Sequence, residues 1–369
     1  MGLAIDMSRH QAGILADSGI RALYQSGALK TARDFDGDQI QPASLDLRLG
    51  TTAYRVRASF MPGPGTAVLD KLERLKLHEI DLTEGAVLET GCVYIVPLLE
   101  SLSLPAEVSA SANPKSSTGR LDIFTRVIVD GAQEFDKVPA GYHGPLYLEV
   151  SPRTFPIVAR TGSRLSQIRF RTGRAQLEEV ELTALHAAET LVASDTPNIS
   201  GGGIALSIDL TGDAKGLVGY RGKHHTGVVD VDKRGVHDLF DFWEPIHDRG
   251  ARELVLDPDE FYILVSREAV HVPPLYAAEM TPFDPLVGEF RVHYAGFFDP
   301  GFGHTAAGGT GSRAVLEVRS HEVPFILEHG QIVGRLIYEH MLERPKALYG
   351  TDLGSNYQAQ GLKLSKHFK

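Results

Sequence analysis

Short apolar runs alternate along the chain with Gly, Pro, Asn and Asp, a pattern typical of β-strands joined by tight turns. Runs such as SLDLRLG (44–50) and VYIVPLL (93–99) have the length of strands and are bounded by turn residues. Apolar residues at helical spacing occur at 14–29, where Ser18 is a candidate N-cap, and in part of 177–191. The pattern predicts a mainly β protein, a sandwich, jelly roll or barrel, with a few short helices.

The second half of the sequence repeats the first. Residues 93–114 align without a gap to residues 261–282, at the offset of 168 that relates Tyr94 to Tyr262. Three further segments keep the same order in both halves: LYLEV and AVLEV (146–150 and 314–318), Pro156 and Gly162 with Pro324 and Gly330, and SLDL and SIDL (44–47 and 207–210). Such a long repeat indicates a duplicated domain, because solenoid repeats span only about 20–50 residues.

A chain of 369 residues, 43% of them hydrophobic, can form two domains with separate cores. We expect domains at 1–185 and 204–369, joined by a linker at 186–203. The net charge of −10 argues against a nucleic-acid-binding surface. The single cysteine, Cys92, excludes a disulfide framework and a cysteine-based zinc site. Without a signal peptide or a long apolar run, we expect a cytoplasmic protein that makes no use of a membrane.

The two halves diverge directly after Pro114 and Pro282. The first continues as KSSTGR (115–120) and the second as FDPLVG (283–288). A lysine, an arginine and two serine hydroxyls can donate to phosphate oxygens, and Gly119 lets the backbone approach a ligand closely. The alternative interpretation is a polar turn that caps a short helix.

Both halves place a glutamate in an apolar strand. In LYLEV, Tyr147 and Glu149 should face away from the leucines, and Glu317 takes the same place in AVLEV. An ordinary solvent-facing glutamate is the simpler interpretation. A partly buried carboxylate could instead be a general base.

Two glycine-containing segments near the C-terminus have open roles. Asp299-Pro-Gly301 lies between aromatic residues and predicts a hairpin. The Gly-rich loop that follows is not a Walker motif, because no Lys-Ser/Thr pair ends it. The segment 349–361 is either a frayed terminus or a lid that closes over a ligand.

Together these segments resemble the dCTP deaminase branch of the dUTPase-like superfamily, in a long, duplicated two-domain form. The resemblance rests on the helix at 14–29, IQPASLDLRLG (40–50), PKSSTGR (114–120), the hairpins, the Leu-Glu strands and YQAQG (357–361). It implies two tandem β-barrel or jelly-roll domains in a trimer-based homo-oligomer. It also implies hydrolytic deamination of dCTP to dUTP, with Mg²⁺ on the triphosphate, no zinc, and dTTP as a candidate feedback inhibitor.

The resemblance also assigns roles to residues. Glu149 or Glu317 would deprotonate the water that attacks C4 of cytosine. Ser116, Ser117 and Arg120 would position the water and the base or bind phosphate. The remaining substrate-binding candidates are Lys115, Ala132, Asp136, Ala295, Asp299, Gln331, Tyr349, Tyr357 and Gln360.

The two halves depart from the family pattern in opposite ways. The family hairpin commonly reads AHRIDPG, and its outline is kept in AGFFDPG (295–301) but less well in AQEFD (132–136). Asn356 stands where a lysine often precedes the tail tyrosine. Because only the first half has the Ser-Ser-x-x-Arg element, we expect a composite site that combines this element with the hairpin and Glu317 of the second half.

Two other functions stay open. A dUTPase, or a bifunctional deaminase and dUTPase, would activate water with Asp136 or Asp299, although the Gly-rich C-terminal phosphate motif of dUTPases is missing. A non-catalytic nucleotide sensor would bind dCTP or dTTP without turnover.

Overall fold

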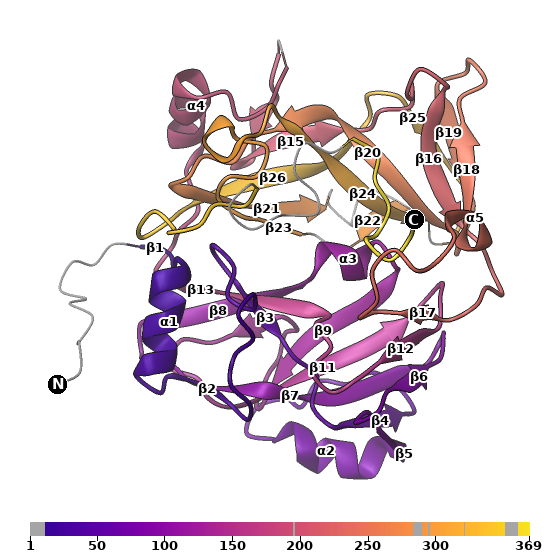
Figure 1. The fold of residues 1–369 in the computed structure, drawn as a ribbon. Helices are drawn as coiled ribbons and strands as arrows, with labels where there is room; N and C mark the ends of the chain where they lie inside the picture. The colour runs from indigo at the N-terminus through magenta and orange to yellow at the C-terminus, as the bar shows by residue number, and fades with distance from the viewer. Residues whose placement is uncertain (1–11, 195, 283–289, 294–295, 321, 351–360) are drawn as a thin grey trace. The chain divides into compact units, whose positions relative to one another are not determined.

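The computed structural model describes residues 12–194, 196–282, 290–293, 296–320, 322–350 and 361–369, and it divides into two compact units (Figure 1). The first unit contains the chain up to Ala175 together with Val228–Arg234 and Met341–Lys346. The second contains Gln176–Gly227, Gly235–His340 and Ala347–Lys369. Both consist mainly of strands, as the sequence predicts. None of the helices in the described ranges is long and apolar enough to cross a membrane.

The helices are short. They are α1 (Asp17–Gln25), α2 (Val68–Leu75), α3 (Ser116–Gly119), α4 (Glu179–Ala188) and α5 (Leu239–Phe242), with a 3₁₀ turn at Thr305–Ala307. The expected N-cap at Ser18 is wrong, because α1 begins at Asp17 after Ala16 and its core-facing residues include Ile20 and Leu23. The Ser18 hydroxyl donates instead to the carboxylate of Glu343.

Three sheets form the first unit. The first contains β1 (Gly13–Ile14), β13 (Ser166–Thr172), β8 (Val108–Pro114), β10 (Lys137–Val138) and β3 (Leu45–Leu47). The second contains β5 (Lys76–Asp81), β4 (Thr52–Val56), β7 (Val93–Ser103), β11 (His143–Pro152), β9 (Ile123–Val129) and β2 (Leu29–Thr31). The third contains β17 (Val229–Asp230), β12 (Ile157–Ala159) and β6 (Ala86–Leu88).

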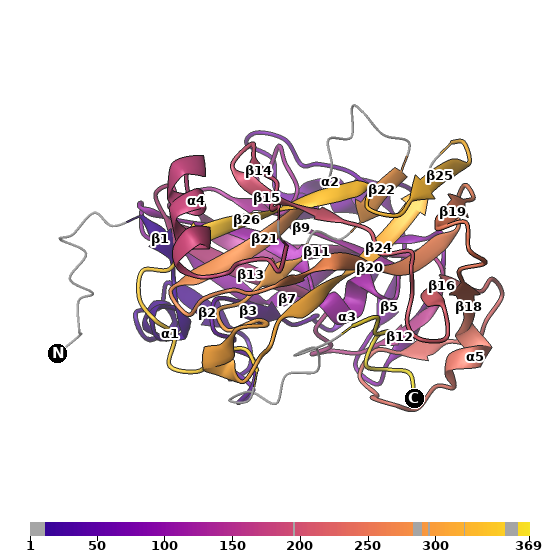
Figure 2. The same cartoon turned by 90° about the horizontal axis from the view of Figure 1, so that it is seen from above.

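The second unit repeats this plan. One sheet contains β14 (Ile199–Ser200), β15 (Gly203–Ser207), β26 (Ile332–His340), β21 (Tyr276–Pro282) and β23 (Phe297–Phe298). Another contains β18 (Trp243–His247), β16 (Leu217–Gly222), β20 (Phe261–Val270), β24 (Ser312–Ser320) and β22 (Phe290–His293), with β20 and β24 side by side in Figure 2. The last contains β19 (Glu253–Leu256) and β25 (Phe325–Glu328).

Matching hydrogen bonds confirm the duplication. The phenolic oxygens of Tyr94 and Tyr262 accept from the backbone N–H of Glu89 and Asp257, both at 3.0 Å. The offset of 168 therefore relates the donors as well as the acceptors. Each tyrosine lies in the central strand of its sheet, β7 or β20, so the repeated sequence forms the same core strand in both units.

The Gly-rich stretch at the expected linker is a hairpin turn. Gly201 and Gly202 have φ values of 60° and 75° and connect the paired strands β14 and β15. Two successive positive φ angles are typical of a type I′ turn, which glycine adopts without strain. Helix α4 and this hairpin both belong to the second unit.

A buried ion pair fixes the segment that precedes the candidate site. The Arg48 and Glu100 side chains are fully buried, and Nε of Arg48 donates to Oε1 of Glu100 at 2.8 Å. Oε2 of Glu100 accepts from the Arg48 backbone N–H at 2.9 Å. Gln39 donates to Oε1 as well, at 2.9 Å. This network ties the chain after β3 to the central strand β7.

We expect Arg48→Met to destabilise the first unit by about 3–5 kcal/mol, because it leaves the Glu100 carboxylate buried without its cation. Urea unfolding followed by hydrogen exchange in residues 44–50 and 93–103 would measure the effect. The matched control is Glu79→Gln, which removes an exposed ion pair with Lys76 and should cost less than about 1 kcal/mol. Equal effects of the two variants would contradict the assignment.

Candidate active site

The KSSTGR element forms the short helix α3 directly after β8. The carbonyl of Lys115 accepts from the N–H of Gly119 at 3.0 Å, and that of Ser116 accepts from Arg120 at 3.1 Å. Ser117 and Arg120 are buried, and Ser116 is partly exposed. The element is thus both a short helix and a concentration of polar groups, so the two interpretations of its sequence are compatible.

The SLDLRLG segment lies beside this helix. Strand β13 pairs with both β3 and β8, so that Gln167 lies opposite Asp46 on one side and Asn113 on the other. The ammonium of Lys115 forms an ion pair with the buried carboxylate of Asp46. Arg164 adds a second cation at 3.6 Å. Lys115 is therefore neutralised within the protein and is not a free phosphate ligand in this conformation.

Glu149 is buried in the middle of a sheet. Only 1% of the residue is exposed, because Tyr147 and Glu149 face protein on the side that the alternation predicts to be solvated. The ladder between β9 and β11 places it opposite Arg126. Nε and Nη2 of Arg126 both donate to Oε1 of Glu149, at 3.0 and 2.5 Å. The second oxygen, Oε2, is buried and has no hydrogen-bond partner among the described residues.

Aromatic rings hold the guanidinium of Arg126. Its Cζ lies 3.6 Å from the ring centroid of Phe135 and 4.6 Å from that of Phe124. Nη2 also donates to the hydroxyl of Ser59 at 2.8 Å. These cation–π contacts and hydrogen bonds restrict the guanidinium to one orientation and with it the carboxylate of Glu149.

Asp136 belongs to the same group. Its backbone is left-handed, with φ of 61°, and its Oδ1 accepts from the N–H of Val127 at 2.7 Å. Burial raises the pKa of Asp136 to about 7, although the Val127 N–H and the charge of Arg126 oppose the shift. We call Phe124, Arg126, Phe135, Asp136 and Glu149 the Arg126 cluster.

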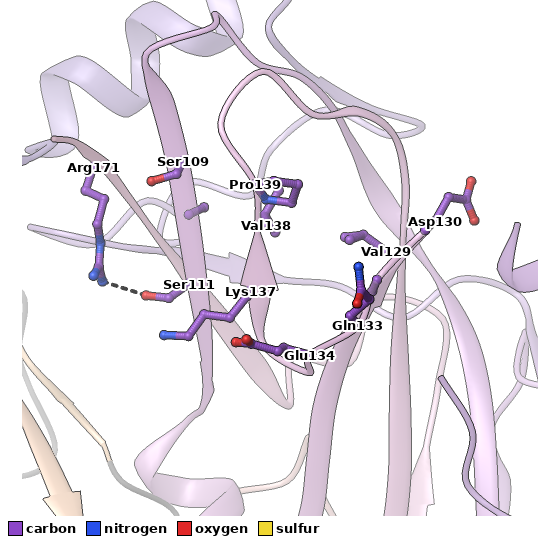
Figure 3. A pocket seen from close by; sticks show the side chains of 13 residues that line it. Ser109, Ser111, Val129, Asp130, Gln133, Glu134, Lys137, Val138, Pro139 and Arg171 are labelled. Atoms are coloured by element: carbon purple, nitrogen blue, oxygen red, sulfur yellow. Dashed lines mark hydrogen bonds between the residues drawn. The ribbon is translucent and has the colours of Figure 1, made fainter. Parts of the chain in front are cut away.

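Ala132 borders a cavity of about 440 Å³ in the first unit (Figure 3). Arg171 and Ser111 lie on one side of it, joined by a hydrogen bond of 2.6 Å, and Val129 and Gln133 lie on the other. The lining also includes Ser109, Asp130, Glu134 and Lys137. Two acidic and two basic side chains balance each other there, so the cavity has no strong preference for anions.

Glu317 takes the equivalent place in the second unit. It is 5% exposed and lies between Ile263 on β20 and His293 on β22 in the strand register. In the first unit the corresponding neighbours of Glu149 are Ile95 and Arg126. Both glutamates are therefore buried in interior strands that pair on both sides, and the solvent-facing interpretation is wrong for each.

The Asp299 turn and the start of the tail meet in the second unit. The N–H of Tyr349 donates to the carbonyl of Pro300 at 2.8 Å, and its ring lies 5.7 Å from that of Phe302. Tyr349 is thus packed rather than frayed. The expected hairpin is wrong for the described residues, because β23 ends before Asp299 and the chain turns into the 3₁₀ segment Thr305–Ala307.

Gln331 shapes a turn. Its side-chain oxygen accepts from the N–H of Glu328 at 3.2 Å, and its carbonyl accepts from Ile208 at 3.0 Å. Three of the expected site residues, Ala295, Tyr357 and Gln360, lie outside the described residues, as does the whole divergent segment 283–288. In the described ranges no three His, Cys, Asp or Glu side chains are grouped closely enough to hold a metal ion.

Sequence reasoning missed Arg126 and Asp46 as members of the site. A signal existed for Arg126, since it is the one charged residue in the strand IFTRVIV, as Glu149 is in LYLEV. Pairing these two strands would have paired the two charges. No comparable signal relates Asp46 to Lys115.

Family models match both halves of the chain. Residues 11–174 match the N-terminal domain of 2′-deoxycytidine 5′-triphosphate deaminase, and residues 178–368 match its C-terminal domain. A dCTP deaminase (dUMP-forming) from Beutenbergia cavernae is 31% identical over 159 residues, 42% of this chain and 78% of that protein. A dCTP deaminase from Actinobacillus succinogenes is 29% identical over 142 residues, 37% of this chain and 70% of that protein.

A solved structure extends the match to nearly the whole chain. The crystal structure of 2′-deoxycytidine 5′-triphosphate deaminase from Agrobacterium tumefaciens is 76% identical and superposes with a TM-score of 0.87. The match covers 92% of this chain and 100% of that one. The duplicated fold and both family models lead to one conclusion: the chain belongs to the dCTP deaminase family.

Proposed function

We propose that this protein hydrolytically deaminates dCTP to dUTP and ammonia, with a buried glutamate as the general base. Family membership supports the substrate and the reaction. The observation that carries the mechanism is the free Oε2 of Glu149. A buried acceptor without a partner has lost its hydration, so a water or a substrate amine bound there would restore a hydrogen bond.

The two oxygens of Glu149 would have different tasks. Oε1 is held by Arg126, which fixes the direction of the carboxylate. Oε2 would take a proton from water as the oxygen attacks C4 of cytosine, and the carboxyl group would then return that proton to the departing amine. The atoms balance: a C4–O bond forms and the bond from C4 to the amino nitrogen breaks, one water proton leaves in ammonia through the carboxyl group, and the other passes from the new hydroxyl to N3 to give the carbonyl.

The Ser-Arg element completes the proposal. Ser116, Ser117 and Arg120 would position the water and the base or bind phosphate oxygens, and Arg120 could contact phosphate in a bidentate manner. Mg²⁺ would arrive with the triphosphate as part of the substrate. The activity as proposed uses no zinc and belongs to a cytoplasmic, trimer-based homo-oligomer that dTTP can inhibit.

A second candidate function is the release of dUMP and pyrophosphate. Its support is the activity for which several relatives are named, such as the dUMP-forming dCTP deaminase of Beutenbergia cavernae. In the first unit Asp136 is the candidate that would activate water on the phosphoanhydride, and its raised pKa sets its ionisation near neutral pH. Incubation with dCTP and separately with dUTP distinguishes the functions, since ammonia marks deamination and pyrophosphate marks the second step.

We expect Glu149→Gln to lower ammonia release from dCTP by about 10²–10⁴, because glutamine cannot accept the proton. Glu317→Gln is the matched control, as it alters the equivalent strand of the second unit. Single-turnover ammonia release would measure both variants. Loss confined to Glu317→Gln would assign the base to the second unit, and retention of activity in both would contradict a glutamate base.

Replacement of Arg126 should change the pH profile as well as the rate. In Arg126→Gln the carboxyl group of Asp136 loses a nearby positive charge that lowers its pKa, so its limb of the kcat/KM profile should move to higher pH. Arg126→Lys should restore part of the profile, since it keeps the charge but not the planar stacking. A lower rate with an unchanged profile in both variants would indicate a structural role only.

The pKa of Asp136 predicts a pH-dependent stability. A carboxyl group with a pKa of about 7 when folded and about 3.9 when unfolded stabilises the fold below pH 4, and this contribution is lost as the pH rises to 7. Asp136→Asn keeps an acceptor for Val127 and tolerates the left-handed backbone. Relative to wild type, its urea midpoint should therefore rise between pH 4 and 7 and then stay constant.

The control for this prediction is Asp81→Asn. Hydrogen bonds from Thr83 lower the pKa of the exposed Asp81 from its usual 3.8, so the urea midpoint of Asp81→Asn relative to wild type should fall as the pH rises toward 3.8 and stay constant between pH 4 and 7. A parallel pH dependence in the two variants would show that Asp136 is not the titrating group.

A further inference from the structure

The two units differ at one small sheet. In the first, β6 and β12 are joined by a third strand, β17, which pairs in parallel with β12. In the second, the equivalent strands β19 and β25 form a two-stranded sheet. Among the described residues, no strand pairs with the outer edge of β25.

The two sheets are equivalent residue by residue. Val158 lies opposite Val87 in the first unit, and Ile326 lies opposite Val255 in the second, at the same offset of 168. The turns that follow these strands also match. The hydroxyl of Ser163 accepts from the N–H of Arg160, and the side-chain oxygen of Gln331, at the same offset of 168, accepts from the N–H of Glu328. The contacts of β17 therefore show what the edge of β25 is built to accept.

Strand β17 is held by backbone bonds and by charge. The N–H groups of Val229 and Val231 donate to the carbonyls of Pro156 and Val158, at 2.9 and 3.2 Å. Between these two valines, Asp230 accepts two hydrogen bonds from Arg160, both at 2.7 Å. An apolar–acidic–apolar segment thus fits an edge that ends in a cation.

The equivalent surface of the second unit is open. Ile326 is 56% exposed, and Val323 is 47% exposed where its counterpart Phe155 is fully buried. By the shared register, the carbonyls of Pro324 and Ile326 face the outer edge. Exposed strand edges of this kind bind extended chains by adding a strand to the sheet.

The charge at the end of this edge is reversed. Glu328 takes the place of Arg160, and the exposed Glu253 lies opposite it on β19. We propose that the outer edge of β25 binds, in parallel, an extended segment of a separate protein in which a lysine or arginine lies between two apolar residues. The backbone would supply affinity, and Glu328 would select the basic side chain.

The test uses two labelled peptides and the full chain. One peptide has the sequence of residues 228–233, VVDVDK, and the other carries D230R and D232R in that sequence. Fluorescence anisotropy should show the basic peptide binding at least tenfold more tightly than the acidic one. Glu328→Arg should reverse this preference, because it recreates the charge of Arg160.

Two further variants separate specific binding from general attraction to an acidic protein. Ile326→Lys should weaken binding of the basic peptide at least tenfold. Glu107→Arg makes the same charge change as Glu328→Arg at an exposed turn elsewhere and should leave binding of the basic peptide within twofold. Equal binding of both peptides, or equal effects of Glu107→Arg and Glu328→Arg, would overturn the proposal. A fall in the particle mass of the free protein on Ile326→Lys would also overturn it, because a second copy would then be the occupant.

Discussion

The buried pair of Arg48 and Glu100 determines where the first candidate site can form. A guanidinium and a carboxylate without solvent are tolerated only when each hydrogen bond is met, and here the backbone of Arg48 and the side chain of Gln39 complete the set. This network fixes the chain that leaves β3, and β3 carries Asp46. The carboxylate of Asp46 then holds Lys115 at the start of α3. One desolvated charge pair thus sets the position of a helix far away in the sequence.

The Arg126 cluster uses the same physics for another purpose. Arg126 neutralises Glu149, and its guanidinium lies over the rings of Phe124 and Phe135, which restrict its orientation. The carboxyl group of Asp136 accepts a hydrogen bond from the N–H of Val127 on β9, and burial raises its pKa. The two neighbouring carboxyl groups therefore lie in different electrostatic environments, because Glu149 is paired with a cation whereas burial raises the pKa of Asp136. Such a difference is what acid–base chemistry requires.

The sequence predicts the strands and the repeat well. The alternation of apolar and polar residues along a strand, and the ungapped offset of 168 between the halves, can both be found in the sequence without knowing the fold. Prediction from the sequence fails where both faces of a sheet are buried. LYLEV alternates as a half-exposed strand would, yet every residue from Leu146 to Val150 is buried, including Glu149. The Asp299 turn is misassigned for a related reason, since β23 ends before it and the next described strand, β24, pairs with β20 and β22 and not with β23. The pairing of Asp46 with Lys115 is a tertiary contact without any local pattern.

The composition of the first unit has a practical consequence for dissecting the protein. Its third sheet includes β17, and the bonds of β1 include one from Leu342 to Ile14, so two segments from the second half of the sequence belong to the first fold. A fragment that ends at Ala175 would lack both and would leave Arg160 without Asp230. The two halves of the sequence are therefore related by duplication, but cutting the chain between them would not give two complete folding units. A shortened version would need residues 228–234 and 341–346 supplied in trans or grafted onto its end.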